Sequence, residues 1–277
     1  MKNFVKKAWL EENINKDNLI ILDARADLSD PEKGMKLYEE GHIKGAHFVS
    51  LEDTMTGELG IHGGRHPLPD MKRFVEDMKG LGIHDDSLLV IYDDGALAMA
   101  ARLWWLLKYI GKSKVYILEG GFDNWLREGG EITDTILKRR KSKGLSLNIN
   151  SDIRVNMEYV RDSIGKEGTV LIDARSYERY LGEVEPLDKF PGRIPSAMNL
   201  PWDSFLNKDG IDMEDIGKLL EPLFQHKEII VYCGSGVSGT VPYIFMDEIG
   251  LKPKLYPGSY SDWISYDENQ VEVGDKE

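Results

Sequence analysis

The chain has 277 residues with 41% hydrophobic side chains, enough for two domains at roughly 100 to 200 residues each. Its formal net charge of -13 argues against nucleic acid or an acidic membrane surface as the main partner. We expect a soluble cytoplasmic protein, because no apolar run reaches the roughly 18 residues of a spanning helix, residues 1–18 do not resemble a signal peptide, and one cysteine allows no intrachain disulfide.

Short apolar, β-branched runs predict buried strands. They occupy residues 19–22, 88–91, 170–172 and 229–231 and lack the polar alternation of a half-exposed sheet. Residues 96–110 are rich in Ala, Leu and Trp and predict a helix that ends at Gly111, and residues 152–164 predict another. Strands alternating with helices predict an α/β fold with a parallel sheet covered on both faces. The chemistry is expected at the carboxyl ends of the strands.

Four short motifs occur twice, in the same order. Leu-Asp-Ala-Arg at 22–25 matches Ile-Asp-Ala-Arg at 172–175, and Gly-His-Ile-Lys-Gly-Ala at 41–46 matches Gly-Arg-Ile-Pro-Ser-Ala at 192–197. Val-Ile-Tyr-Asp at 90–93 matches Val-Tyr-Cys at 231–233, and residues 119–125 match 257–263. The repeat predicts two tandem domains, 1–144 with its linker and 145–277. The basic run 138–143 between the copies is expected to be a solvated linker.

The one cysteine, Cys233, follows the last predicted strand and begins a glycine-rich loop, Cys-Gly-Ser-Gly-Val-Ser-Gly at 233–239, before a helical segment. Backbone N–H groups in such a loop, together with a helix N-terminus, stabilise negative charge on a thiolate or a persulfide. A free cysteine is also a common core residue. A core cysteine, however, does not need the glycines that follow it, so the pattern favours catalysis.

At this loop and across the repeat, the chain resembles the rhodanese family. The resemblance implies two rhodanese-like domains, each a mainly parallel sheet flanked by helices, with Cys233 carrying sulfur as a persulfide. The implied persulfide-binding loop comprises Gly234, Ser235, Gly236, Val237 and Ser238. The first copy has Asp93 at the cysteine position, and a carboxylate cannot pass on a sulfane sulfur. The first domain is therefore expected to be catalytically silent.

The neutral Cys-Gly-Ser-Gly-Val loop is similar to that of the 3-mercaptopyruvate sulfurtransferases. The resemblance implies that Ser235 works in a relay with a histidine and an acid from the first half of the chain. His66 is the candidate histidine and Glu52 the candidate acid, with Asp53 as the alternative. Each of these could instead be an ordinary loop residue, since a general acid or base is assigned by geometry.

Arginines are the expected substrate-binding residues. Arg179 matches the first of two arginines that mercaptopyruvate enzymes use to grip the donor, but the chain has Leu-Asp-Lys at 187–189 where the second is expected. That departure looks more like a thiosulfate sulfurtransferase. Lys189 or Arg65 could supply the second cation, although a lysine lacks the bidentate fork of arginine. Donor preference stays open, with a lean towards 3-mercaptopyruvate.

The resemblance implies a sulfurtransferase that works by double displacement. The partners are a small anionic sulfur donor and then an acceptor, which can be cyanide, a thiol or a protein thiol. No cofactor and no metal are expected, because the histidines and the cysteine have no ligand spacing and no dinucleotide or phosphate loop is present.

Two other functions remain open from the sequence. A cysteine phosphatase of the same fold needs an arginine at the end of its loop, and no arginine follows Gly239 in this chain. A non-catalytic persulfide carrier or partner-binding module could share every feature of the fold, because fold does not determine function.

Overall fold

The computed structural model describes residues 1–138, 142, 144–206 and 210–275, and these form two compact units. The first unit comprises Met1–Gly57 and Pro69–Asn150, and the second comprises Glu58–Leu68 and Ser151–Glu277. The segment 58–68 therefore belongs to the second unit although it lies within the first sequence copy. That the halves 1–144 and 145–277 fold as separate domains stays a prediction. Of the basic run 138–143, residues 139–141 and 143 lie outside the described residues.

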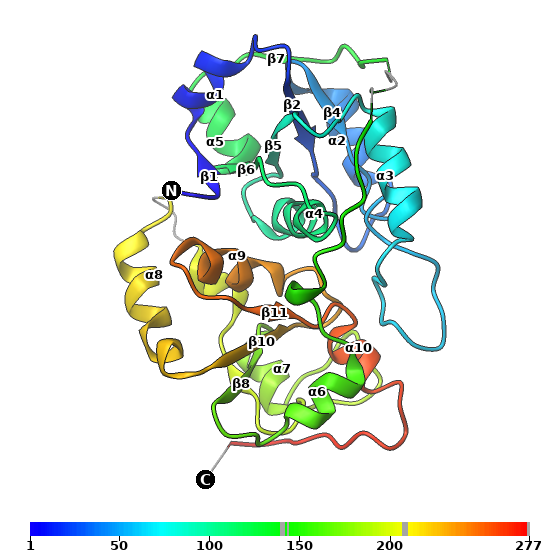
Figure 1. Cartoon of the computed structure of the whole chain (residues 1–277), viewed down its shortest axis with the longest axis vertical. Coiled ribbons are helices and arrows are strands. Elements are labelled where there is room, and N and C mark those ends of the chain that lie inside the picture. The colour runs from blue at the N-terminus through cyan, green and yellow to red at the C-terminus, as the bar shows by residue number, and fades with distance from the viewer. Residues whose placement is uncertain (139–141, 143, 207–209, 276–277) are drawn as a thin grey trace. The chain divides into compact units, whose positions relative to one another are not determined.

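The first unit contains a five-stranded parallel sheet in the order β1-β6-β5-β2-β4 (Figure 1). Its strands are β1 (Phe4–Val5), β2 (Leu19–Asp23), β4 (Ala46–Phe48), β5 (Leu88–Tyr92) and β6 (Val115–Leu118). A second, antiparallel pair joins β3 (His42–Ile43) and β7 (Ile132–Thr133). The two strands expected at 19–22 and 88–91 are adjacent at the centre of the larger sheet and each extends one residue further.

Helices flank this sheet. They are α1 (Lys7–Asn13), α2 (Lys33–Glu40), α3 (Met71–Gly80), α4 (Ala98–Tyr109) and α5 (Gly121–Arg127). The predicted helix at 96–110 is α4, which begins two residues later because the Asp93 and Asp94 carboxylates hold the preceding loop N–H groups in tight turns. Ile21 and Val90 pack in a cluster with α1 and α5, whereas Leu89 and Ile91, on the opposite face, are also fully buried. Both faces of the sheet are therefore covered, as the unbroken apolar runs predict.

The second unit contains a four-stranded parallel sheet in the order β11-β10-β8-β9 (Figure 1). Its strands are β8 (Thr169–Asp173), β9 (Met198–Asn199), β10 (Glu228–Tyr232) and β11 (Lys254–Leu255). Its α-helices are α6 (Met157–Ser163), α7 (Tyr177–Leu181), α8 (Met213–Leu220), α9 (Thr240–Glu248) and α10 (Ser259–Trp263). Its 3-10 helices are η1 (Ser151–Ile153), η2 (Trp202–Phe205) and η3 (Glu221–Gln225). The α/β class and the parallel sheets predicted from the sequence are confirmed.

The helix expected over 152–164 is wrong in extent. The chain forms η1 and then starts again as α6, because the Asn156 side chain accepts the N–H of Tyr159 at 3.1 Å and caps a new helix there.

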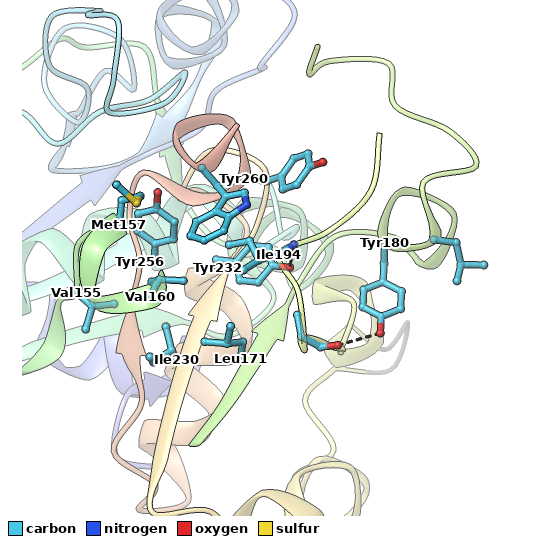
Figure 2. Close-up of a cluster of buried hydrophobic side chains, with 13 residues drawn as sticks. Val155, Met157, Val160, Leu171, Tyr180, Ile194, Ile230, Tyr232, Tyr256 and Tyr260 are labelled. Atoms are coloured by element: carbon cyan, nitrogen blue, oxygen red, sulfur yellow. Dashed lines mark hydrogen bonds between the residues drawn. The ribbon is translucent and has the colours of Figure 1, made fainter. Parts of the chain in front are cut away.

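One face of the second sheet carries the aromatic-rich core drawn in Figure 2. Leu171, Ile230 and Tyr232 point from β8 and β10 into this core, where they meet Val160 of α6 and Tyr260 of α10. The alternate residues of the same strands are buried as well, so helices or loops cover both faces of this sheet. Residues 229–232 of β10 are buried, and this packing fixes the position of the residue that follows them, Cys233.

The same buried network appears in both units, which explains the repeated Asp-Ala-Arg motif. Arg175 makes a bidentate ion pair with Asp173 and donates to the carbonyl of Gly192 at 2.6 Å. The first copy repeats this arrangement with Arg25, Asp23 and Gly41. The copy with Cys233 and the copy with Asp93 share these contacts, so the contacts support the fold of each unit. They do not explain why only one copy has a reactive thiol.

Within the described residues, no helix is both long and apolar enough to cross a membrane.

Candidate active site

The loop from Cys233 to Gly239 connects the carboxyl end of β10 to the start of α9. Gly236 has φ +80°, and a β-carbon there would collide with the carbonyl oxygen of Pro257. A β-carbon at Gly239 would lie 3.4 Å from the Cys233 sulfur. The glycines therefore let the loop fold tightly around the thiol and bring the N-terminus of α9 against it.

Cys233 is buried, and its sulfur accepts the N–H of Gly236 at 3.1 Å. The hydroxyl of Ser259, at the start of α10, lies 3.8 Å from the sulfur, accepts the N–H of Cys233 at 3.1 Å and lies 2.9 Å from the Tyr256 carbonyl oxygen, a nearer acceptor for its proton. The Gly236 N–H, and the Ser259 hydroxyl when it turns towards the sulfur, stabilise negative charge on sulfur. Of the loop N–H groups in the described chain, that of Gly236 contacts the sulfur, and the roles of Gly234, Val237 and Ser238 stay predictions.

Sequence reasoning missed Ser259, although a signal was present. Its backbone has φ +57°, in the left-handed region that a serine rarely adopts, and its counterpart in the first copy is Gly121 with φ +59°. A side chain placed where the repeat has glycine carries a conformational cost, which the hydrogen bonds of its hydroxyl with the Cys233 N–H and the Tyr256 carbonyl help to offset.

Ser235 and His66 are brought together as expected. The His66 ring nitrogen Nδ1 lies 2.7 Å from the Ser235 hydroxyl oxygen. Ser235 is buried and His66 is half-buried. The contact fits a proton shuttle in which the tautomer of His66 decides which group donates.

The segment that carries His66 is anchored to the region around α10. The Gly63 N–H donates to the Asp262 carboxylate at 2.6 Å, and the Arg65 N–H donates to the Ser261 hydroxyl at 3.1 Å. The His62 ring stacks on Tyr266 with centroids 3.9 Å apart. These contacts hold residues 62–65 in the second unit and deliver both Arg65 and His66 to the loop of Cys233.

Two guanidinium groups lie against Gly234, the residue after the cysteine. A β-carbon at Gly234 would lie 2.9 Å from Nη2 of Arg65 and 3.4 Å from both Nη atoms of Arg179. The sequence candidates Arg179 and Arg65 are therefore neighbours beside the loop. Because residue 234 is glycine, both guanidinium groups have room to lie beside the loop.

The carboxylates of Glu185 and Asp188 form ion pairs with these arginines. Glu185 accepts from Arg179 at 2.7 and 3.2 Å and from Arg175 at 3.1 Å. Asp188 forms an ion pair with Arg65 and one with Arg179. Burial opposes ionisation of Glu185, but hydrogen bonds from Arg179 and from backbone N–H groups outweigh it and hold the pKa of Glu185 below its usual range. The cations are thus fixed in orientation, a feature that no sequence motif predicted.

Lys189 and Glu52 are not brought to the loop by the contacts described. Lys189 is exposed, and its ammonium lies over the Phe190 ring at 4.9 Å from the centroid. Glu52 is exposed and belongs to the first unit, as does Asp53. A binding role for Lys189, and an acid role for Glu52 or Asp53, stay predictions.

The matching loop of the first copy contains an acid in place of the thiol. The Asp93 carboxylate accepts the N–H groups of Gly95, Leu97 and Ala100 at 2.9 to 3.1 Å. Burial, with a smaller contribution from Asp94, raises the pKa of Asp93 to about 6 against the effect of these hydrogen bonds. The first loop therefore encloses its own acid group, which has no sulfur chemistry.

The sequence and the fold of this chain are similar to those of known sulfurtransferases. The model of the rhodanese-like domain matches residues 6–128 and 156–266. A probable 3-mercaptopyruvate sulfurtransferase of Pseudomonas aeruginosa is 35% identical over 277 residues, covering 96% of each chain. A putative thiosulfate sulfurtransferase of Mycobacterium tuberculosis is 37% identical over 254 residues, covering 90% of this chain and 89% of its own. The crystal structure of a 3-mercaptopyruvate sulfurtransferase of Escherichia coli superposes with a TM-score of 0.82 at 29% identity, over 94% of this chain and all of that one.

Proposed function

This chain belongs to the rhodanese-like family, and we propose that it is a sulfurtransferase in which Cys233 carries the transferred sulfur as a persulfide. The observation that carries the proposal is the environment of the sulfur. The only thiol in the chain is buried in a glycine-lined loop, with the Gly236 N–H on its sulfur at 3.1 Å and the Ser259 hydroxyl nearby. Such a pocket favours sulfur in its anionic form, which both halves of a double displacement require.

In the first half-reaction the Cys233 thiolate attacks the outer sulfur of thiosulfate or the thiol sulfur of 3-mercaptopyruvate. A sulfur–sulfur bond forms at Cys233 while the donor's bond to that sulfur breaks, and the electron pair leaves with the remainder of the donor. Thiosulfate releases sulfite. 3-Mercaptopyruvate releases the enolate of pyruvate, which takes up a proton. The pair formed by Ser235 and His66 is suited to supplying that proton.

In the second half-reaction an acceptor nucleophile attacks the outer sulfur of the persulfide. The bond between the two sulfurs breaks, and its electron pair returns to Cys233 as thiolate. Cyanide becomes thiocyanate, and a thiol or a protein thiol becomes a persulfide. The lone thiol fits a reducing compartment, and we place the reaction in the cytoplasm.

The donor is proposed to bind through Arg179 and Arg65. Their guanidinium groups lie next to Gly234, so an anionic group held there has its reactive end beside Cys233. Arg65 thereby takes the place of the second arginine that the sequence lacks at 187–189. A guanidinium can hold either a carboxylate or a sulfonate-type group, so this pair supports use of both donors.

Steady-state thiocyanate formation, measured with thiosulfate and with 3-mercaptopyruvate over a range of cyanide concentrations, tests the proposal. We expect parallel double-reciprocal lines for at least one donor, because the persulfide enzyme is a free intermediate. Arg179→Ala should raise KM for the donor more than it lowers kcat. Absence of turnover with both donors, despite stable loading of Cys233, would identify a sulfur carrier in place of an enzyme.

A further inference from the structure

The Asp188 carboxylate binds both of the arginines that lie beside the loop of Cys233. Asp188 contacts Nη1 of Arg65 with one oxygen and Nη2 of Arg179 with the other, the latter at 3.1 Å. The side chain of Asp188 is only 3% exposed, so these contacts are shielded from solvent. Asp188 thus bridges a residue of the segment 58–68 and a residue of α7.

The surrounding ion cluster has no net formal charge. Its cations are the guanidinium groups of Arg65, Arg175 and Arg179, and its anions are the carboxylates of Asp173, Glu185 and Asp188. A donor anion that enters beside the Cys233 thiolate therefore adds uncompensated negative charge. Such charge is costly, because the carboxylates of the cluster are at most 3% exposed and little solvent screens their repulsion.

Each of the two arginines keeps one loop-facing nitrogen that the described residues do not bind. In the described part of the chain, Nη2 of Arg65 and Nη1 of Arg179 make no hydrogen bond, and both lie at Gly234. Asp188 binds Nη1 of Arg65 and Nη2 of Arg179, and Glu185 binds Nε and Nη2 of Arg179. An anion can therefore bind at the Gly234 side while Asp188 stays in place.

We propose that Asp188 is a specificity-determining residue that holds Arg65 and Arg179 in position and, by its own charge, makes the site prefer singly charged over doubly charged sulfur donors. The inference rests on the proposed function, since it assigns the charge class of donor used at that same site. Repulsion by Asp188 is proportional to the charge of the donor. It therefore penalises a dianion such as thiosulfate by twice the free energy that it adds for a monoanion such as 3-mercaptopyruvate.

The test measures binding without turnover. Calorimetric titration of the Cys233→Ser variant with thiosulfate and with pyruvate gives two dissociation constants, one for a dianion and one for a monoanion. The same titrations are repeated with Asp188→Asn added, because asparagine keeps the shape and one acceptor oxygen but removes the charge. The matched control is Glu183→Gln, which removes the same charge from an exposed side chain in the same segment.

We expect Asp188→Asn to tighten pyruvate binding about threefold and thiosulfate binding about tenfold, the dianion factor being close to the square of the monoanion factor. Glu183→Gln should leave both constants nearly unchanged, because solvent and salt screen the charge of an exposed side chain. Equal factors for the two ligands, no change, or weaker binding of both with Asp188→Asn would each overturn the proposal. Thermal unfolding verifies the fold, and Asp188→Ser removes the same charge if the asparagine variant does not fold.

These titrations are independent of catalysis. Charge-selective tightening in the Cys233→Ser background would uphold the role of Asp188 even if the chain with Cys233 intact transferred no sulfur. Sulfur transfer by the chain with Cys233 intact, with no charge-dependent change on replacing Asp188, would remove this inference and leave the proposed function in place.

Discussion

His66 Nδ1 lies 2.7 Å from the hydroxyl oxygen of Ser235, although 169 positions separate the two residues in the chain. The pair can deliver a proton only where a leaving group needs one. The enolate released from 3-mercaptopyruvate needs a proton, whereas sulfite leaves as a stable anion.

Ser235→Ala should therefore lower kcat with 3-mercaptopyruvate by about a hundredfold, within the usual range for proton transfer, and change kcat with thiosulfate by about twofold at most. His66→Gln should behave alike, and the double variant should lose little more than either single one, because the residues act as a unit. Steady-state kinetics with both donors provide the check. Equal losses for both donors would show that the pair only positions the loop.

Ser259 should contribute to sulfur loading through its hydroxyl, which lies 3.8 Å from the Cys233 sulfur and accepts the Cys233 N–H. We expect Ser259→Ala and Ser259→Gly each to slow loading from thiosulfate by about tenfold, the effect of losing one hydrogen bond near a charged group. The glycine variant should be the more stable because position 259 has φ +57°. Stopped-flow loading and thermal unfolding measure the two effects. A wild-type loading rate in Ser259→Gly would rule out a role for the hydroxyl.

Replacing Gly236 tests whether the loop must be tightly folded, and replacing Gly250 is the control. Both have positive φ, but a β-carbon at Gly236 would collide with the Pro257 carbonyl, whereas one at Gly250 would meet nothing within 4 Å. Gly250→Ala should cost about 1 kcal/mol and leave activity intact, because only the backbone is strained. Gly236→Ala should cost about 2 to 5 kcal/mol and abolish loading, since the loop must open. Urea unfolding and loading assays distinguish them; similar behaviour of the two variants would contradict the tight-loop account.

Asp93 predicts a pH dependence of stability. Its pKa is raised to about 6 in the folded chain from 3.8, so the folded state binds more protons than the unfolded state between these values. The contribution of Asp93 is therefore fully present below about pH 4 and is lost as pH rises towards 6, by on the order of 2 to 3 kcal/mol. The stability advantage of wild type over Asp93→Asn should shrink by this amount between pH 4 and pH 7, as measured by urea unfolding. An advantage that grows with pH would mean that the three N–H donors hold an ordinary ionised carboxylate.

Several features could be predicted from the sequence because local chemistry determines them. Unbroken apolar runs predicted the central strands β2, β5, β8 and β10. The repeated Asp-Ala-Arg motif predicted a repeat, and the structure shows that its Asp and Arg form the same buried ion pair in each copy. The glycines after Cys233 predicted a tight loop. The contact between His66 and Ser235 was predicted only through the family resemblance.

The remaining features depend on how distant segments meet. No local pattern shows that residues 58–68 leave their own sequence copy and join the second unit, since that depends on contacts with Ser261 and Asp262. In the sequence, Asp188 is visible only as part of the departure from the expected arginine at 187–189. Its role depends on Arg65, which approaches from that same segment. The pattern over 152–164 predicts too long a helix, because Asn156 caps a new helix inside that range.

The central claim is that Cys233 itself holds the transferred sulfur, and intact mass spectrometry of the chain after incubation with thiosulfate or 3-mercaptopyruvate tests it most directly. The account predicts a gain of one sulfur atom, located on the peptide that contains Cys233, removed by cyanide and absent from Cys233→Ser. A variant without Cys233 that still gains sulfur or still forms thiocyanate at the wild-type rate would contradict it.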